Sequence, residues 1–152
     1  ALAQSGDLWT RLTPNRAILT PHPGEMAMLT SLTRDQIQAD RVNVAKKFAA
    51  QWRQVVVLKG AFTVIASPDG RATLLPFATP ALATAGTGDV LAGTIVAMLA
   101  QGLRAYDAAI VGAYIHGLAG EIAAREIGDA GVVASDLLTR LPVALRQVKR
   151  DM

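Results

Sequence analysis

The stretch Thr84-Ala85-Gly86-Thr87-Gly88-Asp89-Val90-Leu91-Ala92-Gly93 joins a turn bracketed by glycines to the start of an apolar helix. Glycines let the backbone approach an anion closely, and the unpaired N–H groups of a helix start, together with the helix dipole, offer several donors to one phosphoryl group. Asp89 falls in the predicted first turn, where the positive end of the helix favours an ionised carboxylate. The stretch therefore predicts a phosphate-binding turn with a general base beside it, able to take the proton of an attacking hydroxyl.

The same residues also have a simpler interpretation as a loop and a helix cap, because Thr, Gly and Asp are all common at helix starts. From Val90 to Ala100 only Gly93 and Thr94 are not apolar, so we expect this helix to be buried nearly all round. A charged residue at the mouth of a buried helix favours a functional site over a plain cap.

The composition narrows the class of protein. A chain of 152 residues with 51% hydrophobic and 18% charged residues fits one globular unit with a real core. The absence of cysteine excludes disulfides and thiolate metal sites, and two histidines are too few for a histidine cluster without carboxylates, so we assign no metal ligands. The longest apolar runs are shorter than the roughly 18 to 20 residues of a membrane span, and nothing resembles a signal peptide. We expect a cytoplasmic protein without a membrane partner.

The net charge of +3 raises the question of a nucleic-acid partner. The basic residues are dispersed, however, and no aromatic side chains are interleaved with them to stack on bases. A solvated helix face explains them better, and we expect no nucleic-acid partner. These residues are Arg41, Lys46, Lys47 and Arg53, with Arg146, Lys149 and Arg150 near the end of the chain.

Two buried strands are predicted in the first half of the chain. Residues 17–20 form a short apolar run that Pro21 ends, and residues 22–25 are expected to form a loop. Thr33-Arg34-Asp35-Gln36 has the spacing of a capping box and starts a predicted helix that reaches Trp52. Val55-Val56-Val57-Leu58 then has the pattern of a parallel strand covered on both faces.

A hairpin and three helices are predicted to follow. Residues 62–66 and 72–75 flank a turn rich in Pro, Asp and Gly, and an extended stretch is expected over residues 76–84. Helices are expected over residues 90–101, 105–126 and 135–148. Small residues on the middle helix should let another helix approach closely, and they are Ala109, Gly112, Ala113, Gly117 and Gly120.

Strands alternating with helices predict an α/β layered fold, whose ligands bind at the carboxyl ends of the strands. Three candidate motifs fall at such ends: the residues 22–25 loop, Lys59-Gly60, and the glycine turn after residue 84. The convergence of three loops is stronger support for a site than any one of them.

Three segments together resemble the NAD(P)H-hydrate dehydratase family of the ribokinase-like superfamily. They are Leu19-Thr20-Pro21-His22-Pro23-Gly24-Glu25, Val57-Leu58-Lys59-Gly60-Ala61-Phe62-Thr63 and the stretch from Ala83 to Gly93. Gly-Thr-Gly-Asp alone indicates the superfamily, whereas Thr-Pro-His-Pro-Gly-Glu in the right order is more specific. The resemblance runs over residues 1–148 and implies a ribokinase-like fold, a parallel sheet with helices on both faces plus an antiparallel hairpin.

The resemblance also implies an activity. Members of the family use ADP or ATP with Mg²⁺ to repair NADH or NADPH whose nicotinamide ring has been hydrated, by phosphorylating the ring hydroxyl and eliminating phosphate. Asp89 would be the catalytic base and would also contact the substrate, while the backbone of Gly86, Thr87 and Gly88 would hold the transferred phosphoryl group. Lys59, Gly60, Ala61, Phe62 and Thr63 would line the adenine nucleotide. His22, Gly24 and Glu25 would serve the hydrated dinucleotide, with Glu25 supporting its loop or the metal and water around the phosphates.

The chain departs from the family pattern in two respects. Thr79-Pro80-Ala81 stands where the family usually has Asn-Pro-Gly. The family domain also extends further on its N-terminal side, and Ala1-Leu2-Ala3 reads like the middle of an element. We therefore expect residues 1–152 to be a single unit, the C-terminal portion of a dehydratase domain, acting as a homo-oligomer or with a complementing N-terminal segment.

Alternatives to this assignment stay open. A ribokinase-like small-molecule kinase would stop at the phosphate ester, and a non-catalytic fragment would only bind nucleotide or assemble. Single residues have plainer interpretations too: His22 as a rigid turn residue, Lys59 as an ordinary lysine at a strand end. We expect His116 to be a packed, hydrogen-bonded histidine, and Glu121 and Asp136 to be surface or capping groups.

Overall fold

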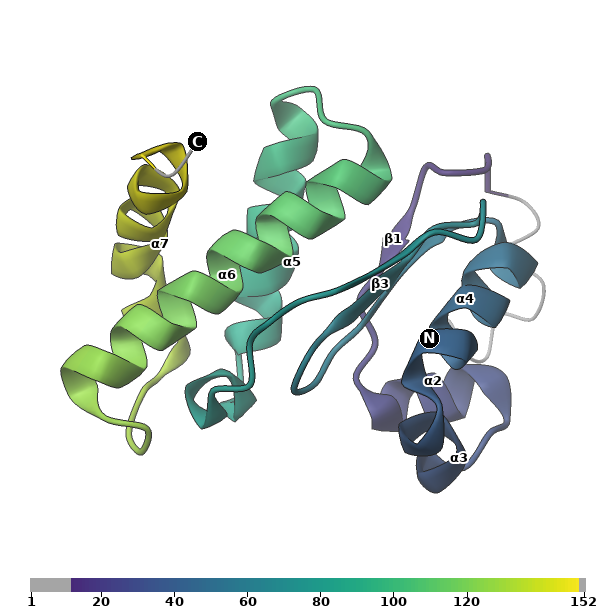
Figure 1. Ribbon diagram of the computed structural model, residues 1–152, viewed down its shortest axis with the longest axis horizontal. Helices are drawn as coiled ribbons and strands as arrows, with labels where there is room; N and C mark the ends of the chain where they lie inside the picture. Colours follow the sequence, from purple (N-terminus) through teal and green to yellow (C-terminus); the bar gives the residue numbers. More distant parts are fainter. Residues whose placement is uncertain (1–11, 151–152) are drawn as a thin grey trace. The chain divides into compact units, whose positions relative to one another are not determined.

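A computed structural model of the chain describes residues 12–150, and it falls into two compact units that meet between Leu75 and Pro76 in the sequence. Figure 1 shows the elements of each unit. The element expected at Ala1–Ala3 lies outside the described residues. The single unit over residues 1–152 stays a prediction.

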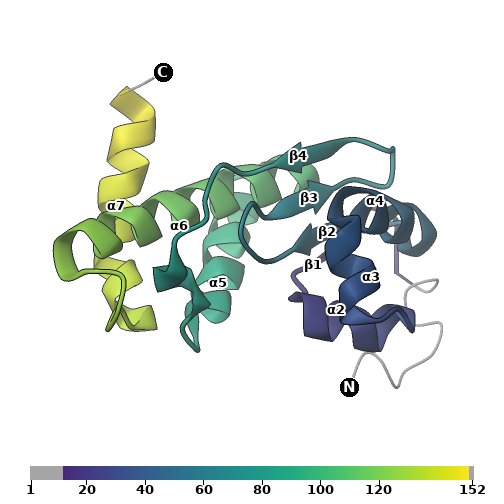
Figure 2. The same cartoon turned by 60° about the horizontal axis from the view of Figure 1, so that its bottom comes forward.

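The first unit is built on a four-stranded sheet in the order β1-β2-β3-β4. Its strands are β1 (Ile18–Leu19), β2 (Val55–Leu58), β3 (Val64–Ala66) and β4 (Ala72–Leu74). β1 pairs with β2 in parallel, with Ile18 opposite Val55, and the other two pairings are antiparallel (Figure 2). All four residues of β2 are buried, as expected of a covered central strand. The predicted parallel strand beside a hairpin is confirmed.

Two helix boundaries in the first unit differ from the prediction. Residues 22–25 are not a loop: α2 (Pro23–Thr30) begins at Pro23, because proline suits the first helical position and His22 caps the helix. The single helix expected up to Trp52 is two helices, α3 (Arg34–Ala39) and α4 (Arg41–Trp52). Asp40 separates them, since its carboxylate accepts the Asn43 backbone N–H and so caps α4. The predicted capping box at Thr33 and Gln36 is confirmed.

The core of the first unit lies between α4 and the sheet. α4 packs against β2 and β3 (Figure 2). The Phe48 and Trp52 rings of α4 lie 5.1 Å apart between centroids. These rings join a buried cluster that includes Met26, Ile37 and Val56. The apolar residues that recur at helical spacing on α4 therefore face β2, the strand that follows α4 in the sequence.

Gln54 is a buried polar side chain that the sequence analysis treated only as a polar break. It is fully buried, and its Oε1 accepts the backbone N–H groups of Arg16 (3.1 Å) and Ala17 (2.9 Å). Its Nε2 donates to the Thr13 carbonyl at 3.1 Å. One side chain thus fixes the segment that leads into β1 beside the start of β2.

We expect Gln54→Leu to lower the free energy of unfolding by about 2–3 kcal/mol, because it removes three hydrogen bonds made by a fully buried side chain. Urea denaturation measures the effect. Gln51→Leu is the matched control, because Gln51 is exposed on α4 and its replacement should change the stability by no more than about 0.5 kcal/mol. Equal stabilities of the two variants would contradict the role given to Gln54.

The second unit is helical. A short 3₁₀ turn, η2 (Pro80–Ala83), precedes α5 (Thr87–Ala100), α6 (Ala105–Ile127) and α7 (Ala134–Arg150). The three predicted helices are confirmed, but η2 interrupts the stretch expected to be extended, because Pro80 starts the turn and Thr79 Oγ1 accepts the Ala81 N–H. No helix among the described residues is long and apolar enough to cross a membrane.

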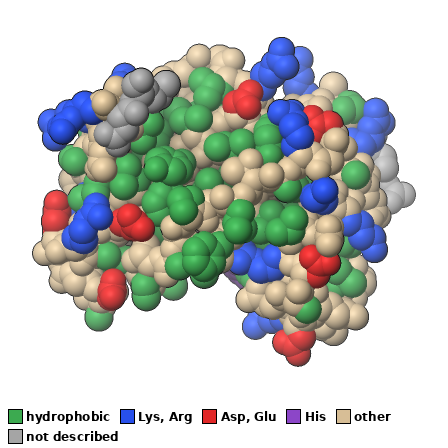
Figure 3. All heavy atoms as spheres, viewed as in Figure 1, with side chains coloured by type: hydrophobic (Ala, Val, Ile, Leu, Met, Phe, Trp, Pro, Cys, Tyr) green, Lys and Arg blue, Asp and Glu red, His purple; other side chains and the backbone are tan. Residues whose placement is uncertain are grey.

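α5 is not buried nearly all round. It buries the side of Leu91, Thr94, Ile95 and Met98, whereas Val96 is 60% exposed. Other apolar side chains of this unit are exposed as well, and Figure 3 shows hydrophobic side chains gathered over it on the face viewed in Figure 1. The prediction from the apolar run, that this helix is buried nearly all round, is therefore wrong.

Small residues on α6 allow close packing, but only one of three glycines does so against a helix. A Cβ added at Gly112 would lie 2.8 Å from the Ile95 Cα of α5. At Gly117 and Gly120 the added Cβ would instead meet Phe77 at 2.2 Å and Leu82 at 2.5 Å. The prediction of a close helix neighbour is right at Gly112, while the other two glycines make room for the segment that precedes α5.

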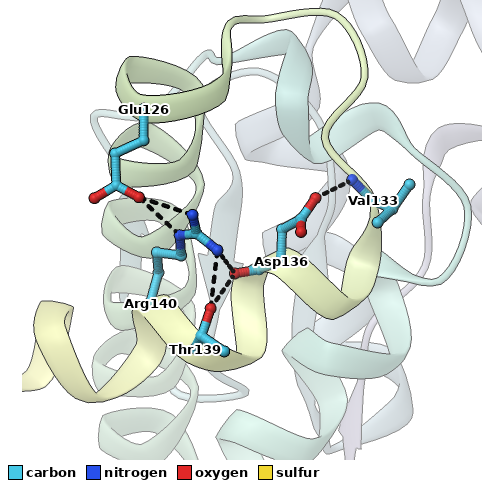
Figure 4. Close-up of polar contacts among 5 residues, drawn as sticks. All are labelled: Glu126, Val133, Asp136, Thr139 and Arg140. Atoms are coloured by element: carbon cyan, nitrogen blue, oxygen red, sulfur yellow. Dashed lines mark hydrogen bonds and ion pairs between the residues drawn. The ribbon is translucent and has the colours of Figure 1, made fainter.

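Side chains at the start of α7 tie it to α6 (Figure 4). Asp136 Oδ2 accepts the Val133 N–H at 2.9 Å and thereby caps the helix. Arg140 Nη2 pairs with Glu126 Oε2 at 2.8 Å, which links the end of α6 to α7. Asp136 is thus a capping group, as expected, and Glu121 pairs with Arg125 on α6.

Candidate functional site

His22 and Glu25 form a reciprocal cap at the start of α2. His22 Nδ1 accepts the Glu25 backbone N–H at 3.0 Å, and Glu25 Oε2 accepts the His22 backbone N–H at 2.6 Å. This is the capping-box arrangement with histidine in the place of serine or threonine. Gly24 lies beside it, because a Cβ there would come within 3.0 Å of the His22 ring. The His22 side chain is therefore held in place and remains exposed.

Lys59 joins this cap from the end of β2. Its Nζ lies 3.5 Å from Glu25 Oε2, and its backbone N–H donates to the Pro21 carbonyl at 2.9 Å. Partial burial raises the pKa of Glu25, but the hydrogen bond from the His22 N–H and the nearby Lys59 ammonium outweigh it, so the pKa lies below its ordinary value. The predicted residues at the ends of two neighbouring parallel strands thus meet, as the sheet rule requires.

The backbone of the 59–63 segment adopts an unusual conformation. Gly60 has φ 143°, and Phe62 has φ 54°, a left-handed value that is uncommon for a bulky residue. Phe62 is 49% exposed, so burial of its ring does not explain the conformation. Thr63 Oγ1 donates to the Gly60 carbonyl at 3.0 Å and closes the turn.

Arg41 is a residue of this site that the sequence analysis assigned to a solvated surface. Its guanidinium donates to the carbonyls of Leu58, at 3.0 Å, and Ala61. Burial lowers the pKa of Arg41 from its ordinary value. In the sequence Arg41 is marked only by its position directly after the helix cap Asp40. That position does not predict a contact with a segment some twenty residues later.

The turn before α5 begins at a glycine with a left-handed backbone. Gly86 is the N-cap, with φ 87°, and within the described chain no side chain hydrogen bonds to this cap. Thr87 is buried and its hydroxyl donates to the carbonyls of Thr84 (2.7 Å) and Leu82 (2.8 Å). Asp89 lies in the first turn and is exposed. The helix start and an available carboxylate therefore stand side by side.

His116 of α6 makes a hydrogen bond to the turn before α5. Its Nε2 lies 2.9 Å from the Thr87 carbonyl, to which the ring N–H donates, and the side chain is buried in α6. Burial lowers the pKa of His116 to about 4, against the opposing effect of the hydrogen bond to Thr87. His116 is thus a packed, hydrogen-bonded histidine, as expected, and it supports the turn before α5.

We expect His116 to make the unfolding free energy depend on pH. Because the pKa of His116 is about 4 in the folded chain and that of an ordinary histidine is 6.5, the unfolded chain binds more protons between these pH values. Stability is therefore complete above about pH 6.5 and falls by about 3 kcal/mol as the pH approaches 4. Denaturation of the wild type and His116→Gln at pH 7 and pH 4.5 measures the difference. Parallel pH profiles of the two proteins would contradict it.

The candidate residues fall into two groups, each defined within its own unit. His22, Gly24, Glu25 and the 59–63 segment come together in the first unit, and Gly86 to Asp89 form one turn in the second. The described residues contain no cluster of three or more His, Cys, Asp or Glu that would hold a metal ion by itself.

The sequence as a whole matches a known family. The profile described as NAD(P)H-hydrate dehydratase matches residues 2–143. The chain is 50% identical over 135 residues to the bifunctional NAD(P)H-hydrate repair enzyme of Moorella thermoacetica, covering 89% of this chain and 26% of that protein. It is 44% identical over 121 residues to the ADP-dependent (S)-NAD(P)H-hydrate dehydratase of Neisseria meningitidis, covering 79% of this chain and 41% of that one.

Solved structures agree with this match. The ADP/ATP-dependent NAD(P)H-hydrate dehydratase of Bacillus subtilis, co-crystallised with ATP and Mg²⁺, is 40% identical, with a TM-score of 0.82 over 86% of this chain and 47% of that one. A ribokinase-like superfamily protein of Enterococcus faecalis is 30% identical, with a TM-score of 0.74 over 88% of this chain and 45% of that one. The fold is therefore ribokinase-like, and the chain spans under half the length of these relatives. This chain belongs to the NAD(P)H-hydrate dehydratase family.

Proposed function

We propose that this chain carries out the nucleotide-dependent dehydration of hydrated NADH and NADPH. The ring hydroxyl attacks the terminal phosphorus of ADP or ATP and its proton passes to Asp89, while the bond from phosphorus to the departing nucleotide oxygen breaks. The phosphate ester is then eliminated: the C–O bond breaks, phosphate leaves with the bonding pair, and loss of a neighbouring ring proton restores the double bond. The net products are the reduced dinucleotide, phosphate and the shortened nucleotide.

The observation that carries the proposal is the turn from Gly86 to Asp89. At this helix start the Thr87 and Asp89 N–H groups donate to backbone carbonyls at 3.3 and 3.1 Å, so we assign the phosphoryl group to the N–H groups of Gly86 and Gly88. An exposed carboxylate, that of Asp89, lies in the same helical turn. The names of the relatives from Neisseria meningitidis and Bacillus subtilis support ADP or ATP as the phosphoryl donor and hydrated NAD(P)H as the substrate.

The other candidate residues take roles in binding. We assign the adenine nucleotide to Lys59, Gly60, Ala61, Phe62 and Thr63, and the hydrated dinucleotide to His22, Gly24, Glu25 and Asp89. Mg²⁺ is expected to arrive with the nucleotide, because this ion keeps several waters and is commonly held through substrate phosphates rather than by a cage of side chains.

The test is turnover of hydrated NADH with Mg²⁺ and either ADP or ATP. Recovery of the reduced-nicotinamide absorbance that depends on nucleotide supports the proposal. Since the chain spans 41% of the Neisseria meningitidis dehydratase and we expect it to be the C-terminal portion of the domain, it is measured alone and fused behind the N-terminal portion of that enzyme. A matched fusion that carries Asp89→Asn controls for activity brought in by the added half.

Two other outcomes have distinct meanings. A released phosphomonoester without recovered absorbance indicates a ribokinase-like kinase that stops at the ester. Absence of turnover in both forms, with nucleotide still bound, indicates a chain whose role is binding or assembly. Either result contradicts the dehydratase proposal.

A further inference from the structure

Arg41 connects the start of α4 to the segment that follows β2. It is the first residue of α4, and its guanidinium donates from Nη2 to the Leu58 carbonyl at 3.0 Å and from Nη1 to the Ala61 carbonyl. The two acceptors flank Lys59 and Gly60. One side chain thus spans the bend of the 59–63 segment and ties both of its sides to the same helix.

The bend needs such a restraint. Gly60 and Phe62 both have positive φ, and a left-handed conformation is unfavourable for a bulky residue without compensation. A Cβ added at Gly60 would lie 3.0 Å from Arg41 Nη2, so the guanidinium packs directly on the backbone of the glycine. The Thr63 hydroxyl closes the bend on its far side.

The way in which Arg41 is held indicates that these two hydrogen bonds determine its position. Its Nε is buried and has no hydrogen-bond partner in the described part of the chain. Leaving a buried donor unpaired is unfavourable. The side chain nevertheless keeps this orientation, in which both terminal nitrogens reach carbonyls of one bend.

We propose that Arg41 is a positioning residue for the nucleotide, which fixes the 59–63 segment in its binding conformation before the nucleotide arrives. The inference rests on the proposed function, in which this segment lines ADP or ATP. A segment that is already ordered loses less conformational entropy on binding, so the affinity for nucleotide is higher. Arginine suits the task because its planar fork reaches two carbonyls at once, whereas a lysine ammonium is a point donor.

The test compares Arg41→Met, Arg41→Lys and a control, Arg146→Met, which removes an exposed arginine of α7. Calorimetry measures the Kd for ADP with Mg²⁺. Hydrogen exchange of the peptide covering residues 59–66, recorded without nucleotide, reports the order of the bend itself. Thermal unfolding shows whether each variant is folded.

We expect Arg41→Met to weaken ADP binding by about 10-fold or more and to speed exchange in the 59–66 peptide by about 10-fold, with exchange in the core of α4 unchanged. Arg41→Lys should fall between Met and the wild type, and Arg146→Met should match the wild type. In turnover assays the effect should appear in the KM for nucleotide, with kcat largely retained at saturation.

A folded Arg41→Met that binds ADP as tightly as the wild type overturns the inference and leaves the proposed function standing. Where Arg41→Met does not fold, Arg41→Lys decides the matter, since a wild-type Kd and unchanged exchange in that variant would overturn the inference as well. A wild-type chain that binds neither ADP nor ATP instead overturns the nucleotide site itself, and the inference with it.

Discussion

Asp89→Asn is expected to lower turnover of hydrated NADH by about 10²–10⁴-fold, which is the usual contribution of a general base. The amide keeps the size and shape of the carboxylate but cannot accept the proton of the attacking hydroxyl. Because Asp89 is exposed in the first turn of α5 and the proposed phosphate donors are backbone groups, the variant should bind ADP with an affinity within about twofold of the wild type.

A matched substitution separates loss of the base from loss of charge at a helix start. Asp107 is also exposed and also lies in the first turn of its helix, α6. Asp107→Asn should therefore leave both turnover and ADP binding unchanged. Turnover by Asp89→Asn at the level of Asp107→Asn would show that Asp89 is not the base.

Gly117→Ala is expected to lower the free energy of unfolding by about 2 kcal/mol. The added methyl would lie 2.2 Å from Phe77 Cδ2, so the ring has to move. Phe77 is buried and packs edge-on against Tyr114 at 5.0 Å between ring centroids, which leaves it little room. Overpacking of this kind costs about 1–3 kcal/mol and occasionally more, and it outweighs the gain of about 1 kcal/mol from replacing glycine in a helix.

Gly93→Ala makes the same chemical change where space is open. Gly93 lies inside α5, it is exposed, and a Cβ there meets nothing within 4 Å. We expect it to raise the free energy of unfolding by about 0.5–1 kcal/mol, through helix propensity alone. Chemical denaturation measures the free energy of unfolding of both variants. If the contact with Phe77 matters, Gly117→Ala lowers it and Gly93→Ala raises it, whereas equal stabilities would contradict the close packing.

Local patterns predicted much of this fold. Val55–Leu58 is an uninterrupted branched and aliphatic run and proves to be the fully buried β2. The Thr33–Gln36 spacing starts a helix, and the Pro, Asp and Gly residues between β3 and β4 form the hairpin turn. In each case the residues that decide the structure lie within a few positions of one another, so the sequence alone contains the signal.

Two helix boundaries were predicted wrongly although the sequence contains the residues that set them. Proline and glycine at positions 23 and 24 read as a loop, yet proline at N1 and Glu25 at N3 are helix-start residues. The apolar periodicity across Asp40 read as one helix, although Asp40 is itself a good cap. Both errors have the same cause: the loop tendency of proline and glycine, or the apolar periodicity, was given more weight than the residue that caps the helix.

The site was predicted in part for the same reasons. The turn from Gly86 to Asp89 is contiguous, and the meeting of Glu25 with Lys59 follows from two parallel strands that end at one edge. The contacts of Arg41 with Leu58 and Ala61, and of Gln54 with Thr13, join residues 17 to 41 positions apart. No periodicity specifies such pairs, because they depend on how the helix and strands pack.

The reciprocal cap at His22 also decides what its imidazole can offer a ligand. While Nδ1 accepts the Glu25 backbone N–H, the ring proton of the neutral side chain must be on Nε2. The ring therefore presents an Nε2–H donor, which lies 3.7 Å from Glu25 Oε2. A proton acceptor at that nitrogen would require this tautomer to change and the cap to break. A molecule recognised by His22 should accordingly bring an acceptor, such as an amide carbonyl or a phosphate oxygen, to meet it.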